Sequence, residues 1–205
     1  MLTQIVTADD PSALPRALAY LKSGELVAFP TDTVYGLGTS AFNPLSIDKL
    51  FVVKGRDSAK AIAVLIGEPR ALKQVAAKMT GVAEQLAERF WPGPLTLVVL
   101  RHPNLPDNLS PLSTIGVRMP NHPVALELLR QSGPLAVTSA NLSGQPSTIT
   151  ARQVSSQLSG RLPLIIDGGQ TPGGQPSTVV DCTGSELVIL RPGPLSLHDL
   201  KSALA

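Results

Sequence analysis

LVAFPTDTVYGLG (26–38) decides the fold, because a short apolar run ends there in several hydroxyls, one carboxylate and two glycines. Residues 26–29 predict a buried strand that ends at Pro30, since proline has no N–H for a β-ladder. Loops at strand ends gather ligands in α/β sheets, and glycines let the backbone approach a ligand closely. The stretch therefore predicts a binding loop. A turn capped by its own Thr and Asp side chains is the alternative.

Further polar loops follow along the chain, each beside an apolar run. They are KGR (54–56), GVRMP (116–120), TSANLSGQPS (138–147), PSTVVD (176–181) and LRPG (190–193). All of them contain Arg, Lys or hydroxyl side chains. Together with the first loop they predict one site for a polyanionic ligand, and hence an enzyme.

Length and composition limit the possible number of domains, the kind of partner and the location of the protein. The 205 residues suffice for one core, and no stretch resembles an interdomain linker, so we expect a single domain over 1–205. A net charge of +2 leaves the kind of partner open. Cys182 is the single cysteine, and the three histidines lack metal-ligand spacing. Because no signal peptide or membrane-length apolar run is visible, we expect a cytoplasmic protein with no membrane partner.

Helical and strand patterns alternate along the chain. Helices are predicted over 11–23, 44–54, 70–77, 82–90, 122–131, 150–158 and from 196 onward, and strands over 26–29, 61–66, 95–100, 115–119, 135–138, 164–167, 178–181 and 187–190. The adjacent strands at 178–190 indicate antiparallel pairing. We therefore expect an α/β fold with a mixed sheet covered by helices.

The KGR and TSAN loops carry groups suited to a nucleotide. Gly55 can bend the chain so that Lys54 and Arg56 face one triphosphate, Arg as a bidentate fork and Lys as a point charge. Cations favoured by a helix C-terminus are the equal alternative. Ser139 and Asn141 supply hydroxyl and amide groups for phosphate or ribose, although both residue types also build ordinary turns.

In their order along the chain, PTDTVYGLG, KGR, WPGPLTLV (91–98), VRMP, TSANLSG, PSTVVD and LRPG resemble the motifs of the YrdC-like threonylcarbamoyl-AMP synthases. The match extends from about residue 14 to about residue 194. The resemblance implies a twisted, mostly parallel α/β sheet with helices on both faces and a concave basic face. It also implies a nucleotidyltransferase that makes threonylcarbamoyl-AMP and pyrophosphate from L-threonine, bicarbonate and ATP. A separate threonylcarbamoyl transferase complex would then use the product to modify tRNA.

The same resemblance implies roles for single residues. Thr33, Arg118 and Arg191 would contact substrate, with Arg118 pairing bidentately with the threonine carboxylate. The ATP site would comprise Lys54, Arg56, Lys60, Thr114, Ser139, Asn141 and Ser147. Magnesium would bridge the phosphates without a protein ligand. The reaction needs no protein nucleophile, so the cations would act by positioning and charge neutralisation, and Asp32 would serve as a base or orient Thr31.

Two positions depart from the family pattern. Ala61 replaces a usual proline and Leu65 a histidine found in some close relatives, which leaves the substrate contacts there open. The Gly- and Pro-rich segment 168–176 is the best candidate for a mobile lid.

Two other functions remain open. One is a module of the same fold that grips tRNA or double-stranded RNA by its phosphates without chemistry, since an aromatic content of 3% leaves few platforms for stacking single-stranded bases. The other is a paralogue with a different carbamoyl acceptor. Binding that weakens with salt and ignores threonine would indicate the RNA module.

Overall fold

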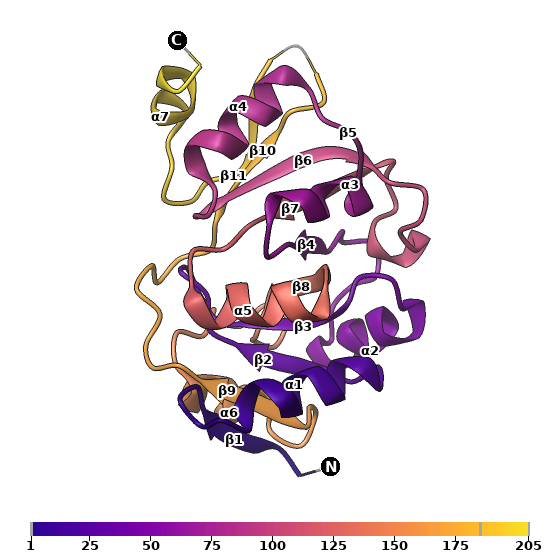
Figure 1. Cartoon of the computed structure of the whole chain (residues 1–205), viewed down its shortest axis with the longest axis vertical. Coiled ribbons are helices and arrows are strands. Elements are labelled where there is room, and N and C mark those ends of the chain that lie inside the picture. The colour runs from indigo at the N-terminus through magenta and orange to yellow at the C-terminus, as the bar shows by residue number, and fades with distance from the viewer. Residues whose placement is uncertain (1, 185, 205) are drawn as a thin grey trace.

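One mixed β-sheet runs along the molecule, with its strands stacked one beside the next (Figure 1). The computed structural model describes residues 2–184 and 186–204. The strands are β1 (Gln4–Thr7), β2 (Val27–Phe29), β3 (Gly36–Ser40), β4 (Ala63–Leu65), β5 (Ala76–Lys78), β6 (Leu95–Arg101), β7 (Thr114–Arg118), β8 (Leu135–Ser139), β9 (Leu164–Asp167), β10 (Thr178–Asp181) and β11 (Val188–Arg191). Their order is β1-β9-β2-β3-β8-β4-β7-β6-β10-β11, and β5 pairs with β6 beside this path.

Helices cover both faces of the sheet. They are α1 (Ala13–Lys22), α2 (Pro44–Lys54), α3 (Leu72–Val75), α4 (Gly81–Phe90), α5 (Pro123–Ser132), α6 (Ala151–Leu158) and α7 (Leu197–Ser202), with 3₁₀ turns η1 (Pro69–Ala71) and η2 (Asp107–Leu109). Side chains alternate across a strand, so Val27 and Phe29 of β2 join the apolar cluster of α1 and α5. Ala28 belongs to the cluster that contains the buried residues of α2, α4 and α6.

The α/β class with a mixed sheet is confirmed, but the expectation of a mostly parallel sheet is wrong. Among the described residues, six of the ten strand pairings are antiparallel and four are parallel. One reason is that several strands pair with the next strand along the chain, as where the loop 30–35 joins β2 directly to β3 as a hairpin. A parallel neighbour would require a crossover of a dozen or more residues.

Three strands, β1, β3 and β5, were not expected, and one predicted helix is wrong. Gly36 and Gly38 disguise β3, because glycine disfavours strands. Both are nevertheless required there, since an added Cβ would lie 2.9 Å or 3.1 Å from a methyl group of Val137. The predicted helix 70–77 is instead η1 and the single turn α3, after which Ala76 enters β5 and pairs with β6.

Within the described ranges no helix combines the length and the apolar character needed to cross a bilayer.

A glycine after β4 allows the sheet to approach α5 closely. An added Cβ at Gly67 would lie 2.6 Å from the backbone nitrogen of Arg130. We expect Gly67→Ala to lower the free energy of unfolding by about 1–3 kcal/mol through overpacking, as measured by urea denaturation. Gly81→Ala is the control, because no atom lies within 4 Å of its added Cβ. Equal losses in the two variants would contradict the packing argument.

Candidate functional site

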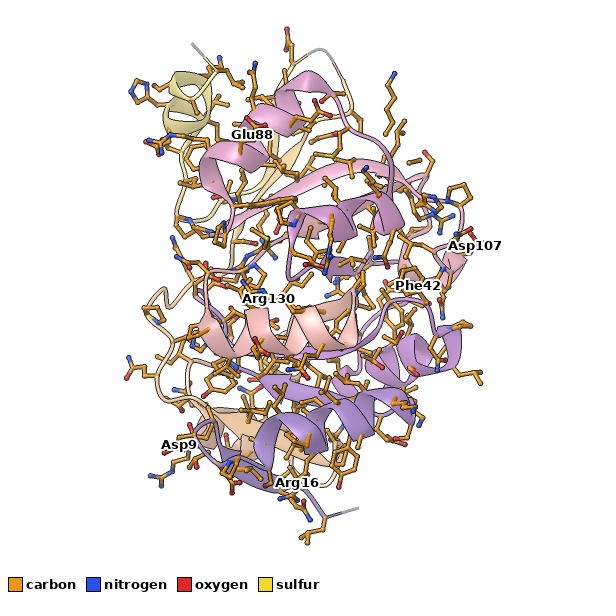
Figure 2. The ribbon with its side chains drawn as sticks, in the orientation of Figure 1. Asp9, Arg16, Phe42, Glu88, Asp107 and Arg130 are labelled. Carbon is orange, nitrogen blue, oxygen red and sulfur yellow. The ribbon has the colours of Figure 1, made fainter. Side chains whose placement is uncertain are left out.

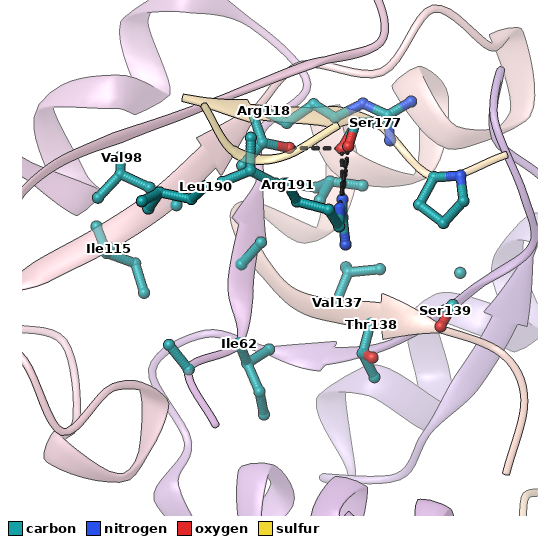
Figure 3. Close-up of a pocket in the computed structure, with 18 of the residues that line it drawn as sticks. Ile62, Val98, Ile115, Arg118, Val137, Thr138, Ser139, Ser177, Leu190 and Arg191 are labelled. Carbon is teal, nitrogen blue, oxygen red and sulfur yellow. Dashed lines mark hydrogen bonds between the residues drawn. The ribbon is translucent and has the colours of Figure 1, made fainter. Parts of the chain in front are cut away.

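A cavity of about 500 Å³ opens on one face of the sheet. Its floor consists of small residues on adjacent strands. Val98 of β6 lies beside Gly116 of β7, and Ala63 of β4 lies beside Val137 of β8. A Cβ added to Gly116 would lie 3.0 Å from Cγ2 of Thr96 and 3.6 Å from Cβ of Ala63. Close-packed strands with small residues therefore leave room above the floor for a ligand (Figure 3).

Three arginines give the cavity its charge. Arg56, Arg118 and Arg191 line it, whereas Asp181 is the single carboxylate residue on the lining among the described residues. Burial lowers the pKa of all three guanidinium groups, and the charge of Arg56 lowers that of Arg191 further. Guanidinium groups remain protonated in proteins. The surplus of positive charge therefore favours an anionic ligand.

Arg191 is held against the loop that leads into β10. Its Nη2 donates to the carbonyl oxygen of Ser177 at 2.8 Å and to Oγ of Ser177 at 3.0 Å (Figure 3). Oγ of Ser177 also lies 2.8 Å from Oγ1 of Thr96. Neither Ser177 nor Thr96 was predicted as a site residue, although Ser177 lies in the PSTVVD motif that drew attention to this loop.

Arg118 joins three segments of the cavity wall. Its Nε donates to the carbonyl of Gly93 at 2.9 Å and its Nη1 to Oγ1 of Thr33 at 2.9 Å. Its Nη2 forms an ion pair with Asp32, whose Oδ1 also accepts the backbone N–H of Asn121 at 3.0 Å. Arg118 is only 6% exposed, so these contacts replace most of its hydration.

The 30–35 loop is both a capped turn and part of the cavity. Thr31 Oγ1 donates to the carbonyl of Val34 and accepts the N–H of Thr33. The loop is thus a turn capped by one of its own Thr side chains, as the alternative to a binding loop predicted. Thr31 and Thr33 nevertheless line the cavity. Asp32 contacts Arg118 and Asn121, and no bond joins it to Thr31 among the described residues. Asp32 therefore does not orient Thr31 by a hydrogen bond, and its role as a base stays a prediction.

Lys54 lies inside the protein and does not line the cavity. Its helix begins at the predicted cap, Asn43, and ends at Gly55 in the left-handed conformation with φ 60°. This bend sends Arg56 to the cavity but leaves Lys54 only 2% exposed. In this arrangement only Arg56 of the two predicted cations lines the cavity. Desolvation lowers the pKa of Lys54 to about 8, and the charge of Arg56 adds to the effect.

The structure brings part of the predicted site together. The predicted residues on the cavity lining are Thr33, Arg56, Thr114, Arg118, Ser139 and Arg191. The predicted residues away from the lining are Lys54, Lys60, Asn141 and Ser147. Polar lining residues that were not predicted as site residues are Thr31, Tyr35, Thr96, Ser110, Thr138, Ser177 and Asp181. Side chains of these kinds occur throughout the chain, so only the assembled fold distinguishes them.

Both departures from the family pattern lie at the cavity. Ala61 and Leu65 line it, and the carbonyl of Ala61 accepts Nη2 of Arg56 at 2.9 Å. A backbone carbonyl is available from any residue, proline included. The Ala61 departure therefore keeps this support for Arg56, while its effect and that of Leu65 on substrate binding remain predictions.

The segment 168–176 packs against the 30–35 loop. The N–H of Gly174 donates to the carbonyl of Thr33 at 2.9 Å, and an added Cβ at Gly173 would lie 2.6 Å from the carbonyl oxygen of Asp32. The segment is thus attached to the cavity wall, as a lid would require, and its mobility remains a prediction.

The structure is thus a mixed α/β sheet with a basic cavity on one face, a combination suited to a small anionic ligand. More narrowly, the chain belongs to the Sua5/YciO/YrdC family, whose model, described as telomere recombination, matches residues 19–193. This confirms the family inferred from the motifs.

Several relatives carry the same enzyme name. The threonylcarbamoyl-AMP synthase of Bacillus subtilis (strain 168) is 42% identical over 99% of this chain, which spans 59% of that protein. A putative threonylcarbamoyl-AMP synthase of Mycobacterium tuberculosis (strain ATCC 25618 / H37Rv) is 39% identical, and the match covers 99% of this chain and 96% of that protein. The chain thus spans little more than half of one relative and nearly all of the other.

A solved structure also matches closely. The crystal structure of P. abyssi Sua5 complexed with L-threonine superposes with a TM-score of 0.91 at 41% identity, covering 93% of this chain and 57% of that chain. This chain therefore has the same overall backbone fold as that member of the family.

The buried Asp32–Arg118 ion pair is expected to stabilise the fold. Removing one partner of a buried pair leaves an uncompensated charge, so Asp32→Ala should lower the free energy of unfolding by about 3–5 kcal/mol. Asp107→Ala is the matched control, because Asp107 pairs with Arg101 but is 95% exposed at the surface (Figure 2). Its expected cost is below about 1 kcal/mol. Urea denaturation of both variants measures the two losses in free energy of unfolding. Equal losses would refute the role of the Asp32–Arg118 ion pair in stability.

Proposed function

We propose that this chain is a threonylcarbamoyl-AMP synthase, an enzyme that joins L-threonine, bicarbonate and ATP to give threonylcarbamoyl-AMP and pyrophosphate. The observation that carries the proposal is the convergence of Arg56, Arg118 and Arg191 on one cavity. The relatives that bear this name support the choice of reaction. We further propose a single domain over 1–205, a cytoplasmic location and use of the product by a tRNA-modifying threonylcarbamoyl transferase complex.

The phosphates of ATP fit the side of the cavity that carries Arg56 and Arg191. Nε of Arg56 is buried and has no hydrogen-bond partner among the described residues, and an unpaired buried donor is costly unless a ligand accepts from it. Thr114 and Ser139 line the same cavity as further hydrogen-bonding groups. The base would pack on the apolar lining, to which Val98, Ile115 and Leu190 contribute.

L-threonine fits beside Arg118. The guanidinium uses three N–H groups on Gly93, Thr33 and Asp32, and arginine has five. The remaining two suit a carboxylate, and the contact with Thr33 fixes the plane of the fork. The family member from P. abyssi that was solved with L-threonine supports this assignment.

The chemistry needs positioning and charge compensation. The threonine amine attacks the carbon of bicarbonate with loss of water, or the carbon of carbon dioxide with loss of a proton, giving a carbamate. A carbamate oxygen then attacks the α-phosphorus of ATP, and the bond to pyrophosphate breaks. Arg56 and Arg191 would stabilise the negative charge that develops on the departing pyrophosphate, while Arg118 would hold the amino acid in line. No side chain has to form a covalent bond.

Magnesium enters this proposal as the ion that ATP carries on its phosphates. The described residues contain no group of three or more His, Cys, Asp or Glu side chains placed to hold a metal. The donor set of the cavity, arginines and hydroxyls with one carboxylate, therefore suits the phosphates rather than the ion.

The reaction is tested by release of pyrophosphate from ATP and magnesium, with and without L-threonine and bicarbonate. We expect release only when both co-substrates are present, because the carbamate is the nucleophile. ATP turnover with another amine would instead identify a paralogue. Absence of turnover, with salt-sensitive binding of double-stranded RNA, would identify an RNA-binding module.

Arg118→Lys tests the assignment of the threonine carboxylate. Lysine offers a point charge in place of a bidentate fork, so we expect the KM for L-threonine to rise at least about tenfold. The KM for ATP should change less, because Arg118 would not contact the phosphates. Arg130→Lys is the control on exposed α5 surface (Figure 2) and should leave both values unchanged. Equal increases for both substrates with Arg118→Lys would contradict the assignment.

A further inference from the structure

Lys54 carries a positive charge that three loop oxygens surround. Its Nζ donates to the carbonyl of Ser139, to the carbonyl of Asn141 at 2.5 Å, and to Oδ1 of Asn141 at 3.4 Å. An ammonium group has three N–H donors. The contacts with the two carbonyls are short and the contact with Oδ1 is long, so the loop carbonyls are the main partners of Nζ.

The loop that Lys54 contacts, residues 139–145, is also bound to the end of α2. The N–H of Ser143 donates to the backbone carbonyl of Lys54 at 2.8 Å. Nδ2 of Asn141 donates to the carbonyls of Leu142 and Gln145 at 2.8 Å and 2.7 Å. Lys54 and Asn141 thus form one buried network that links α2 to the loop.

The network determines which way the loop faces. Carbonyl groups carry partial negative charge, and several of them directed at one buried point repel each other unless a cation lies between them. With Lys54 in that place, the carbonyl of Ser139 points inward while Ser139 itself lines the cavity. Without the cation, the loop oxygens would turn toward water and Ser139 would move with them.

We propose that Lys54 is a positioning residue, whose ammonium group holds the loop 139–145 so that Ser139 faces the ligand. It does not contact the ligand itself. The kinetic part of the test rests on the proposed function, whereas the structural part does not.

Hydrogen exchange tests the proposal on the intact chain. Lys54→Met removes the ammonium group but keeps a long apolar stem, and Lys49→Met is the control on the exposed side of the same helix. Loss of charged hydrogen bonds should accelerate exchange of the Ser143 and Gln145 amides at least about tenfold. Strands β2 and β9 should exchange as in the wild type. Lys49→Met should leave the loop unchanged.

A double-mutant cycle with Ser139→Ala separates positioning from direct contact. If Lys54 acts through Ser139, the Lys54→Met/Ser139→Ala variant should lose no more kcat/KM than the worse single variant. If Lys54 binds phosphate independently, the two fold-losses should multiply.

Three results would overturn the proposal. They are unchanged loop exchange in Lys54→Met with weakened ATP binding, faster exchange throughout the chain, and multiplied losses in the cycle. If Lys54→Met does not fold, Lys54→Gln, which keeps two donors, is judged by the same criteria. If the wild type releases no threonine-dependent pyrophosphate, the proposed function fails and the exchange result alone decides the role of Lys54.

Discussion

The contact on which the cavity depends is the buried guanidinium of Arg118. It binds the 30–35 loop through Asp32 and Thr33 and the segment before β6 through Gly93, while its own backbone belongs to β7. One side chain therefore fixes the relative positions of three segments that are far apart in the sequence. A charge can be buried in this way because each contact replaces a bond to water. These contacts consequently hold the wall of the cavity together where the amino acid is proposed to bind.

The positive charges of this region have different polar partners, and these partners determine which of the cations is available to a ligand. Arg118 has a carboxylate, Lys54 has loop carbonyls, and Arg191 has the carbonyl and hydroxyl of Ser177. Arg56 alone among these four has a buried side-chain nitrogen with no hydrogen-bond partner in the described structure. The positive potential that protein groups leave unneutralised is therefore highest near Arg56. A phosphate would gain the most binding energy at that position.

The sequence predicts the features that depend on residues close by in the chain. It does not predict the contacts between segments that are far apart in the chain. The ends of α2 follow from Asn43 and Gly55, and the ordered motifs identify the family and six of the lining residues. The direction of Lys54 was not predictable, because its acceptors lie 85 and 87 positions further along the chain. The antiparallel pairings of β3 and β4 with β8 were missed for a similar reason, since pairing of remote strands leaves no local signal. Strand β3 was hidden by glycines that only packing against Val137 explains.

The strand order also determines when the cavity can exist during synthesis. Strand β9 lies next to β1 near one end of the sheet, while β10 and β11 lie at the other end (Figure 1). The chain spans this distance through 168–176, and it delivers Ser177 and Arg191 to a wall built mostly from earlier residues. Pairings between remote segments form slowly, because closing the intervening loop costs entropy before the new contacts can stabilise the chain. A ribosome-bound chain that has just exposed β9 would therefore have most of the sheet but only part of its anion site, and binding competence would arise last.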